Sequence, residues 1–225
     1  MIDTSLFSRH CIDDALSTLL ASEDSSVHGY TPASGLPPLR RALAEALALY
    51  ELKLSPERIY VTCGAAAGLA IAARAILASG DEVLFLSDPR PEQSRAVEAA
   101  GAAVSTSGLT DRTRLVILSG NTPIPDGLAA SLRAAESEFG RPLYLLADRL
   151  SPSPAAEALL REYGSFLLNE DFGDELSGEA IGFLAVDTRS ADADLVFDAV
   201  AGAGRAMGYV NPPSLMQRAI LACLG

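Results

Sequence analysis

Short, continuously apolar runs recur along this 225-residue chain, and most are followed by a segment in which apolar residues have helical spacing. Strands that are apolar throughout are buried on both faces, and intervening helices of about 10–15 residues favour a parallel sheet covered on both sides. We therefore predict an α/β fold with three layers, αβα, and a mainly parallel sheet. The expected strands span residues 59–62, 82–86, 115–118, 143–146, 166–168 and 181–186, and the expected helices span residues 13–20, 37–52, 65–77, 91–100, 126–139, 154–163, 192–202 and 213–224.

Nothing along the chain marks a domain boundary, since it has no internal repeat, low-complexity tract or linker. Residues 1–225 are therefore predicted to form a single domain. Residues 1–36 form an arm or entry region, which ends in turn-forming residues. Pro37 and Pro38 then suit the first turn of the helix that follows.

Ligands of such sheets bind beyond the carboxyl ends of the strands, so the residues after each strand are candidates for a site. Gly64, Ala65 and Ala66 follow the first strand, where glycine permits close backbone approach and a new helix offers free N–H groups. Asp148 follows the fourth strand. A buried carboxylate at that point requires hydrogen bonds or a cation.

The charge balance excludes some partners, because the chain has 17 basic and 29 acidic residues and a formal net charge of −12. Such a surface repels nucleic acid and anionic membranes. No apolar run reaches the roughly 18–20 residues of a spanning helix, and no signal pattern opens the chain, so we expect a cytoplasmic protein. Cys11, Cys63 and Cys223 have no metal-binding spacing, and we expect reduced thiols.

Seven short segments carry a further signal. The first, within residues 27–40, consists of VHGYTP followed by GLPPLR, and the other six are VTCGAAAGL at 61–69, GDEVL at 80–84, SGNTP at 119–123, LAD at 146–148, GEAIGF at 178–183 and GYVNPPSLMQR at 208–218. In this order they resemble segments of the class I and II aminotransferases, enzymes of fold type I that use pyridoxal phosphate (PLP). The resemblance covers nearly the whole chain. It implies the large domain of a PLP-dependent transferase, with the C-terminal small domain missing.

The resemblance also implies roles for the residues after the strands. Asp148 stands where the family has the acid that keeps the pyridine nitrogen of PLP protonated. The alternative is a structural acid that is satisfied by local N–H groups or by an arginine such as Arg149. Gly64, Ala65 and Ala66 match the phosphate-binding turn, and the alternative is an ordinary strand-to-helix turn.

Three more residues match positions that touch the cofactor in the family. Asn121 and Thr122 adjoin the position of an asparagine that contacts the phenolic oxygen of PLP. Tyr30 matches a tyrosine that reaches the phosphate of the neighbouring subunit. Its alternative is a turn tyrosine that packs on its own domain.

By the same resemblance, the lysine that forms the Schiff base is absent. Its position falls on Phe172, and the positions within two residues of it carry no amine either. The chain has one lysine, Lys53, which precedes the first strand and is expected at the opposite edge of the sheet. The phosphate-holding arginine of the family falls on Ala180. Carboxylates at residues 170, 171, 174, 175 and 179 are expected to crowd the phosphate anchor.

We therefore predict an aminotransferase-like pseudoenzyme with a binding, scaffolding or regulatory role in amino-acid or secondary metabolism. No cofactor is expected, or PLP if any. One alternative is an enzyme that holds PLP or pyridoxamine phosphate non-covalently, or another small molecule in the same cleft. Another is a reduced chain with no role of its own. The family builds its sites between subunits, so we expect a homodimer, or a heterodimer with an active aminotransferase, and no nucleic acid or membrane partner.

Overall fold

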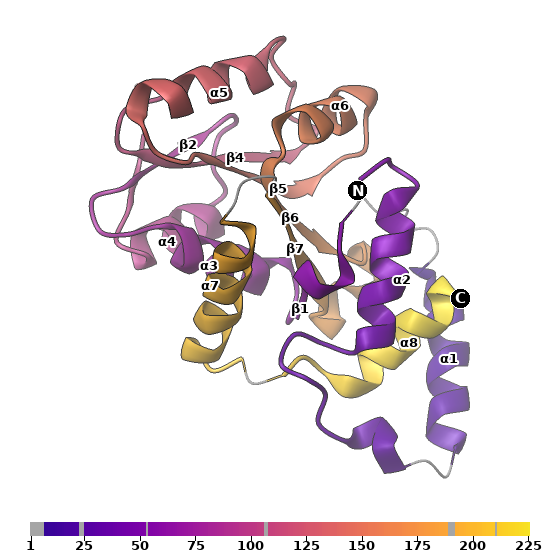
Figure 1. Ribbon diagram of the computed structural model, residues 1–225. Coiled ribbons are helices and arrows are strands. Elements are labelled where there is room, and N and C mark those ends of the chain that lie inside the picture. Colours follow the sequence, from indigo (N-terminus) through magenta and orange to yellow (C-terminus); the bar gives the residue numbers. More distant parts are fainter. Residues whose placement is uncertain (1–6, 23–24, 53, 106–107, 189–191, 210) are drawn as a thin grey trace.

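The computed structural model describes residues 7–22, 25–52, 54–105, 108–188, 192–209 and 211–225 (Figure 1). A seven-stranded sheet in the order β1-β7-β6-β5-β4-β2-β3 forms its centre. The pairs β2–β3, β2–β4, β4–β5 and β5–β6 are parallel, whereas β7 runs antiparallel to both β6 and β1. The mainly parallel sheet is confirmed. Its strands are β1 (Ile59–Thr62), β2 (Glu82–Phe85), β3 (Ala103–Val104), β4 (Thr113–Gly120), β5 (Tyr144–Leu150), β6 (Ser165–Asp171) and β7 (Gly182–Thr188).

Helices cover both faces of this sheet, which gives the predicted three layers. The buried side chains of α3, α4 and α7 share one apolar cluster with the sheet, and those of α1, α2, α5, α6 and α8 share another. The helices are α1 (Arg9–Ala21), α2 (Pro37–Ala48), α3 (Ala65–Ile76), α4 (Pro91–Ala99), α5 (Leu128–Phe139), α6 (Pro154–Tyr163), α7 (Ala193–Ala206) and α8 (Ser214–Leu224), with short 3-10 helices η2 (Ser25–His28), η3 (Pro56–Arg58) and η4 (Asp174–Glu179).

The central strands divide their side chains between the two clusters because successive residues of a strand point to opposite faces. In β5, Leu145 and Ala147 belong to the cluster under α2, α5 and α6, whereas Tyr144 and Leu146 belong to the cluster under α3, α4 and α7. All four are buried, so the strand reads as one apolar run. This alternation places Asp148, two residues beyond Leu146, on the α3 and α4 side.

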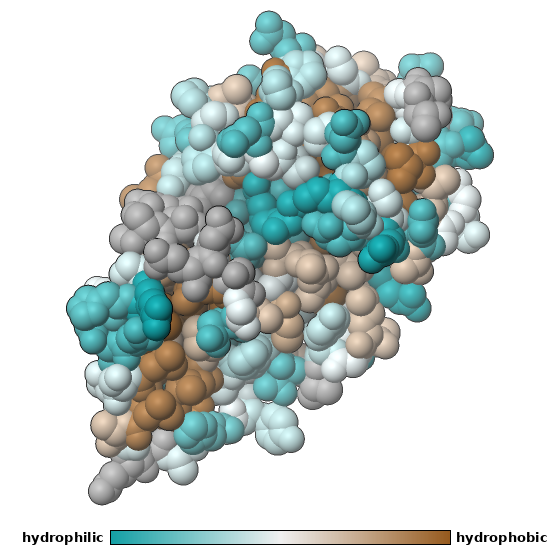
Figure 2. Space-filling view, turned by 180° about the vertical axis from the view of Figure 1, so that it is seen from behind, coloured by the Kyte–Doolittle hydropathy of each residue, from teal (hydrophilic) through white to brown (hydrophobic). Residues whose placement is uncertain are grey.

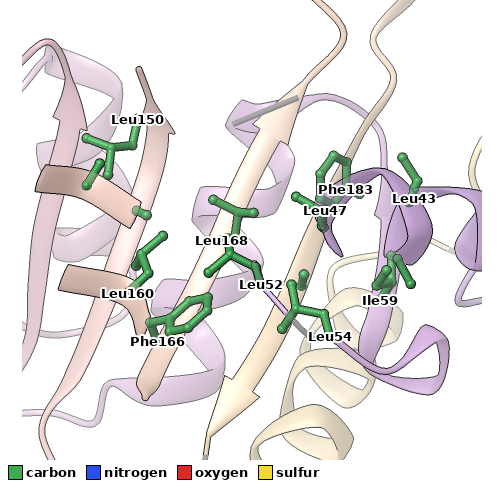
Figure 3. Close-up of a cluster of buried hydrophobic side chains, with 14 of the residues drawn as sticks. Leu43, Leu47, Leu52, Leu54, Ile59, Leu150, Leu160, Phe166, Leu168 and Phe183 are labelled. Atoms are coloured by element: carbon green, nitrogen blue, oxygen red, sulfur yellow. The ribbon is translucent and has the colours of Figure 1, made fainter. Parts of the chain in front are cut away.

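On the other face, α2 lays its leucines against the end of the sheet (Figure 3). Leu43 and Leu47 are fully buried beside Ile59 of β1 and Phe183 of β7. Pro37 occupies the first turn of α2, where a missing N–H leaves no hydrogen bond unmade. The predicted helical pattern stops sooner than expected, because α2 ends at Ala48 and a turn follows.

The two ends of the described chain are linked covalently. Helix α1 packs on α8, and a disulfide joins Cys11 to Cys223, whose Cα atoms lie 6.1 Å apart. The prediction of three reduced thiols is therefore wrong for this pair. Cys63 alone among the cysteines is free. None of the helices within the described ranges is long and apolar enough to cross a bilayer.

Candidate functional site

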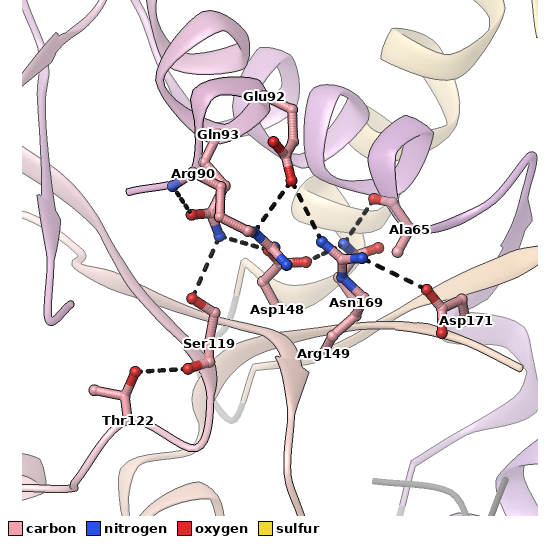
Figure 4. A network of polar contacts seen from close by, with 10 residues as sticks. All are labelled: Ala65, Arg90, Glu92, Gln93, Ser119, Thr122, Asp148, Arg149, Asn169 and Asp171. Carbon is pink, nitrogen blue, oxygen red and sulfur yellow. Dashed lines mark hydrogen bonds and ion pairs between the residues drawn. The ribbon is translucent and has the colours of Figure 1, made fainter. Parts of the chain in front are cut away.

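Asp148 is the centre of a polar network at the carboxyl ends of β4, β5 and β6 (Figure 4). Its side chain is 1% exposed. Oδ2 accepts hydrogen bonds from Nη2 of Arg90 at 2.6 Å and from Nε2 of Gln93 at 2.7 Å, and Oδ1 accepts one from Nδ2 of Asn169 at 2.8 Å. One guanidinium and two amides therefore satisfy this buried charge, as a carboxylate removed from water requires.

The start of α4, after β2, presents Arg90 and Gln93 to this carboxylate. Pro91 opens α4, and Arg90 caps the helix from the residue before it. Oε1 of Gln93 accepts a hydrogen bond from the backbone N–H of Arg90 at 2.9 Å, which leaves Nε2 free to donate to Asp148. Gln93 is fully buried and also lies 3.4 Å from the hydroxyl of Ser119. The start of α4 thus fixes both donors.

Asn169 supplies the third donor from the neighbouring strand β6, in register with Asp148. Its Nδ2 donates to the backbone carbonyl of Ala65 at 2.9 Å as well as to Asp148. Its Oδ1 faces Gly68 of α3 so closely that a Cβ there would lie 1.9 Å from the oxygen. The glycine lets α3 approach the sheet, and Asn169 ties the start of that helix to the network.

A chain of ion pairs extends from the network toward the start of α3. Glu92 lies 3.1 Å from Nε of Arg90 and 3.6 Å from Arg149, which in turn lies 3.9 Å from Asp171. The alternative reading of Asp148 is a structural acid satisfied by local N–H groups or by an arginine such as Arg149, and the arginine that pairs with it is Arg90. Arg149, whose φ of 51° is left-handed, pairs with Glu92 and Asp171 instead.

A cavity of about 220 Å³ opens at the first turn of α3. Gly64, Ala65 and Ala66 line it together with Arg149 and Ala180. Gly64 has a φ of 86°, which glycine adopts without strain, and α3 begins directly after it. The sequence correctly placed this turn beyond a strand.

Of the five carboxylates expected to crowd this turn, the structure describes the side chains of three, and it places only Asp171 of these at the cavity. Asp171 lines the cavity and is paired with Arg149. Glu179 is exposed and is not part of the lining. Glu170 is buried, and burial raises its pKa to about 7, with Asp171 and Asp148 adding to the rise. Alternation along β6 directs its side chain to the face opposite Asn169.

Phe172 is part of the core rather than of the cleft beside Asp148. It is 1% exposed and belongs to the cluster under α2, α5 and α6. Its ring meets that of Phe7 edge to face, with centroids 4.8 Å apart, and lies 6.0 Å from that of Phe183. Lys53, the chain's one lysine, falls outside the described residues.

Asn121 and Thr122 lie after β4, beside a second cavity of about 250 Å³ that residues 151–153 close from the other side. The Thr122 hydroxyl donates to the carbonyl of Ser119 at 2.6 Å, so Ser119 joins this loop to the Asp148 network. Tyr30 lies elsewhere: it is 93% exposed on the loop before α2 and lines neither cavity. Packing of Tyr30 on its own domain is therefore wrong.

The residues that sequence reasoning missed are Arg90, Gln93 and Asn169. Each follows or ends a strand, as the rule for such sheets requires. A buried carboxylate also calls for a cation, so Arg90, after β2, was a candidate in principle. To choose Arg90 over Arg149, one must know the sheet order, in which only β4 separates β2 from β5. In the part of the chain that the structure describes, no cluster of side chains could hold a metal ion.

Comparisons with known proteins agree with this architecture. A family model described as aminotransferase class I and II matches residues 4–135. The crystal structure of an amino transferase from Eubacterium rectale is 29% identical, with a TM-score of 0.86, and the match covers 97% of this chain and 64% of that one.

More distant structures share the fold. An Escherichia coli protein, whose structure is described as identifying a methionine aminotransferase function, is 20% identical with a TM-score of 0.76, and the match covers 96% and 62% of the two chains. A double mutant of Thermus thermophilus aspartate aminotransferase is 23% identical with a TM-score of 0.73, and the match again covers 96% and 62%. This chain thus spans less than two thirds of each structure. No curated protein matches it.

Proposed function

The chain belongs to the class I and II aminotransferases, and from that premise we propose that it is a pseudoenzyme that does not transaminate. Its role is then to bind or regulate a partner, in amino-acid or secondary metabolism. The observation that carries this proposal is that Asp148 is already paired with an arginine of the same chain. The acid that would hold a pyridinium nitrogen already holds the guanidinium of Arg90 at 2.6 Å.

The residues around Asp148 do not fit PLP. A pyridinium N–H would need an acceptor position on this buried carboxylate, and three of the roughly four positions are taken, two on Oδ2 and one on Oδ1. Arg90 already supplies the positive charge, so a pyridinium would place a second cation on one carboxylate that is 1% exposed. Arg90 thus provides the cation that the pyridinium of a coenzyme would provide, and the site supports no catalytic step through PLP.

The missing amine supports the same conclusion. Phe172 stands at the position that the resemblance assigns to the Schiff-base lysine, and its ring is packed between Phe7 and Phe183. Ala180 stands at the position of the phosphate-holding arginine and carries no charge. Imine formation needs an amine at the cofactor aldehyde, and the sequence offers one lysine, Lys53.

Absorbance spectroscopy with added PLP tests this proposal. Wild-type protein is expected to give no more imine absorbance and no more borohydride-trapped adduct than its lysine-free variant, and no transamination with a panel of amino donors. The Lys53→Arg variant is the matched control, because it removes the one lysine and keeps the charge. An imine band on the wild type that disappears in Lys53→Arg, together with turnover of an amino donor, would contradict the proposal.

One observation favours a second candidate function, in which the cleft still binds a small molecule such as PLP or pyridoxamine phosphate without a covalent bond. The cavity at the first turn of α3 has a volume of about 220 Å³ and contains the Arg149 side chain. A spectral change on adding PLP to the wild type that borohydride does not trap, and that Arg149→Met abolishes, would favour this candidate.

We further propose that the protein forms a homodimer, with a heterodimer with an active aminotransferase as the alternative. Tyr30 is the residue to test, since its side chain is 93% exposed and it matches the family's tyrosine that reaches the neighbouring subunit. Analytical ultracentrifugation should show a dimer that Tyr30→Asp weakens, whereas Leu195→Asp on α7, a second exposed apolar position, should not. A monomeric wild type would contradict the homodimer. The cytoplasmic location stays a prediction from the sequence.

A further inference from the structure

We propose that the Cys11–Cys223 disulfide is a reducible clasp, which holds α1 on α8 and keeps Phe7 over the aromatic cluster of Phe172 and Phe183. A dithiol reductant would open it. This inference is independent of whether the protein transaminates. It rests on the narrow, partly exposed packing of α1 and on the surface position of the bond.

Apart from the disulfide, helix α1 is held to the domain by one narrow apolar face. Ile12 is its one buried residue, Ala15, Leu16 and Leu19 pack partly buried against the core, and α8 is the helix on which it packs. Its ion pairs, Arg9 with Asp13 and His10 with Asp14, join side chains that are all more than half exposed, and such pairs add little stability. A helix of 13 residues is marginal on its own. The covalent bond to Cys223 therefore adds to a packing that is partly exposed to solvent.

The disulfide is accessible to a reductant. Both cysteines are partly exposed, and Cys223 lies near the end of α8. Hydrophobic side chains reach the surface at this end of the molecule, where α1 and α8 lie (Figure 2). Leu20 of α1 is 57% exposed. The bond thus closes a surface interface rather than a sealed core.

The clasp also determines what covers Phe172. Phe7 precedes Cys11 by four residues, is 1% exposed and meets the Phe172 ring edge to face. When α1 is fastened to α8, the short segment between them holds Phe7 in this cluster. When α1 detaches, Phe7 loses that tether, and the ring of Phe172 loses its cover.

The chemistry is ordinary thiol–disulfide exchange. A thiolate of the dithiol attacks one sulfur of the pair, and the S–S bond breaks as a mixed disulfide forms. The second thiol of the reductant displaces the remaining cysteine and becomes oxidised to a cyclic disulfide. Two electrons and two protons pass to the protein, which then carries free thiols at Cys11 and Cys223. An oxidant of the disulfide class reverses the step.

Thiol titration and hydrogen exchange on the full chain test the proposal. Without reductant, denatured protein should titrate one thiol, that of Cys63, and after dithiothreitol it should titrate all three cysteines. Amides of α1 should then exchange roughly tenfold faster or more, with a smaller change in α5, which packs in the core. Cys11→Ser and Cys223→Ser should show the fast exchange without reductant. Cys63→Ser should keep the full response to reductant.

Three results would overturn the proposal. The first is three titratable thiols before any reduction. The second is unchanged exchange in α1 after complete reduction of the pair. The third is an equal rise in α1 and α5, because that would mean global destabilisation rather than release of one helix.

Discussion

Replacement of Arg90 by methionine should destabilise the protein far more than the same replacement at Arg149. Both side chains are about a third exposed, at 38% and 35%, and both lie at the same edge of the sheet. Arg90, however, bonds to a carboxylate that is 1% exposed, whereas the carboxylates near Arg149 are 46% and 36% exposed. Methionine keeps most of the side-chain length and removes the charge in each case.

The magnitude follows from what remains around Asp148. Removing one partner of a fully buried pair costs about 3–5 kcal/mol. Here Gln93 and Asn169 still donate to Asp148, and Arg90 is partly solvated, so we expect about 2–3 kcal/mol. For a domain of this size each kcal/mol lowers Tm by roughly 2–4 °C, which gives a fall of about 4–12 °C. Arg149→Met should cost less than about 1 kcal/mol, as half-exposed ion pairs do.

Urea denaturation followed by circular dichroism measures these differences, and equal slopes for all variants would show that the unfolded states are comparable. A double-mutant cycle with Asp148→Asn isolates the pair, and the coupling energy between Arg90 and Asp148 should be about 1–3 kcal/mol. Equal losses in Arg90→Met and Arg149→Met, together with an additive cycle, would refute the view that the Arg90 charge compensates Asp148.

Two further predictions concern the surroundings of this network. Gly68→Ala should destabilise the protein even though alanine favours helix by about 1 kcal/mol, because its Cβ would lie 1.9 Å from Oδ1 of Asn169. The control is Gly202→Ala in α7, which has open space around the new Cβ and should be neutral or stabilising. A lower melting temperature for Gly202→Ala than for Gly68→Ala would be evidence against close packing of α3 on the sheet. Glu170→Gln should remove a pH dependence, because the folded-state pKa of Glu170 is raised from 4.5 to about 7. The contribution of protonated Glu170 to the free energy of unfolding, on the order of 3 kcal/mol, is complete below about pH 4.5 and is lost as pH rises through about 7. Parallel stability curves for the wild type and this variant between about pH 4 and 8 would contradict that assignment.

Much of the fold was predictable because the strands are apolar on both faces. The runs at β1 and β5 stand out from their surroundings, and the helix at Pro154–Tyr163 was predicted to the residue. Strand ends were less predictable: β4 continues through Ser119 and Gly120, and β5 through Asp148, because their backbones still pair within the sheet. The edge strand β3 is only two residues long and gives no periodic signal.

The partners of Asp148 and the disulfide were not predictable from the sequence for a related reason. Arg90 lies 58 residues from Asp148, and Cys11 lies 212 residues from Cys223. Proximity along the chain favoured Arg149, but the Arg149 side chain pairs with Glu92 and Asp171 instead. Which segments meet depends on sheet order and on the packing of α1 against α8, and local pattern contains neither.

The most direct test of the central claim is a calorimetric titration of PLP into the wild type and into Asp148→Asn. If Arg90 already neutralises Asp148, PLP binding should not depend on this carboxylate, and the titrations of the wild type and of Asp148→Asn should be alike. Saturable binding to the wild type that is lost in Asp148→Asn would show that the acid is available to a pyridinium nitrogen, and would contradict the account.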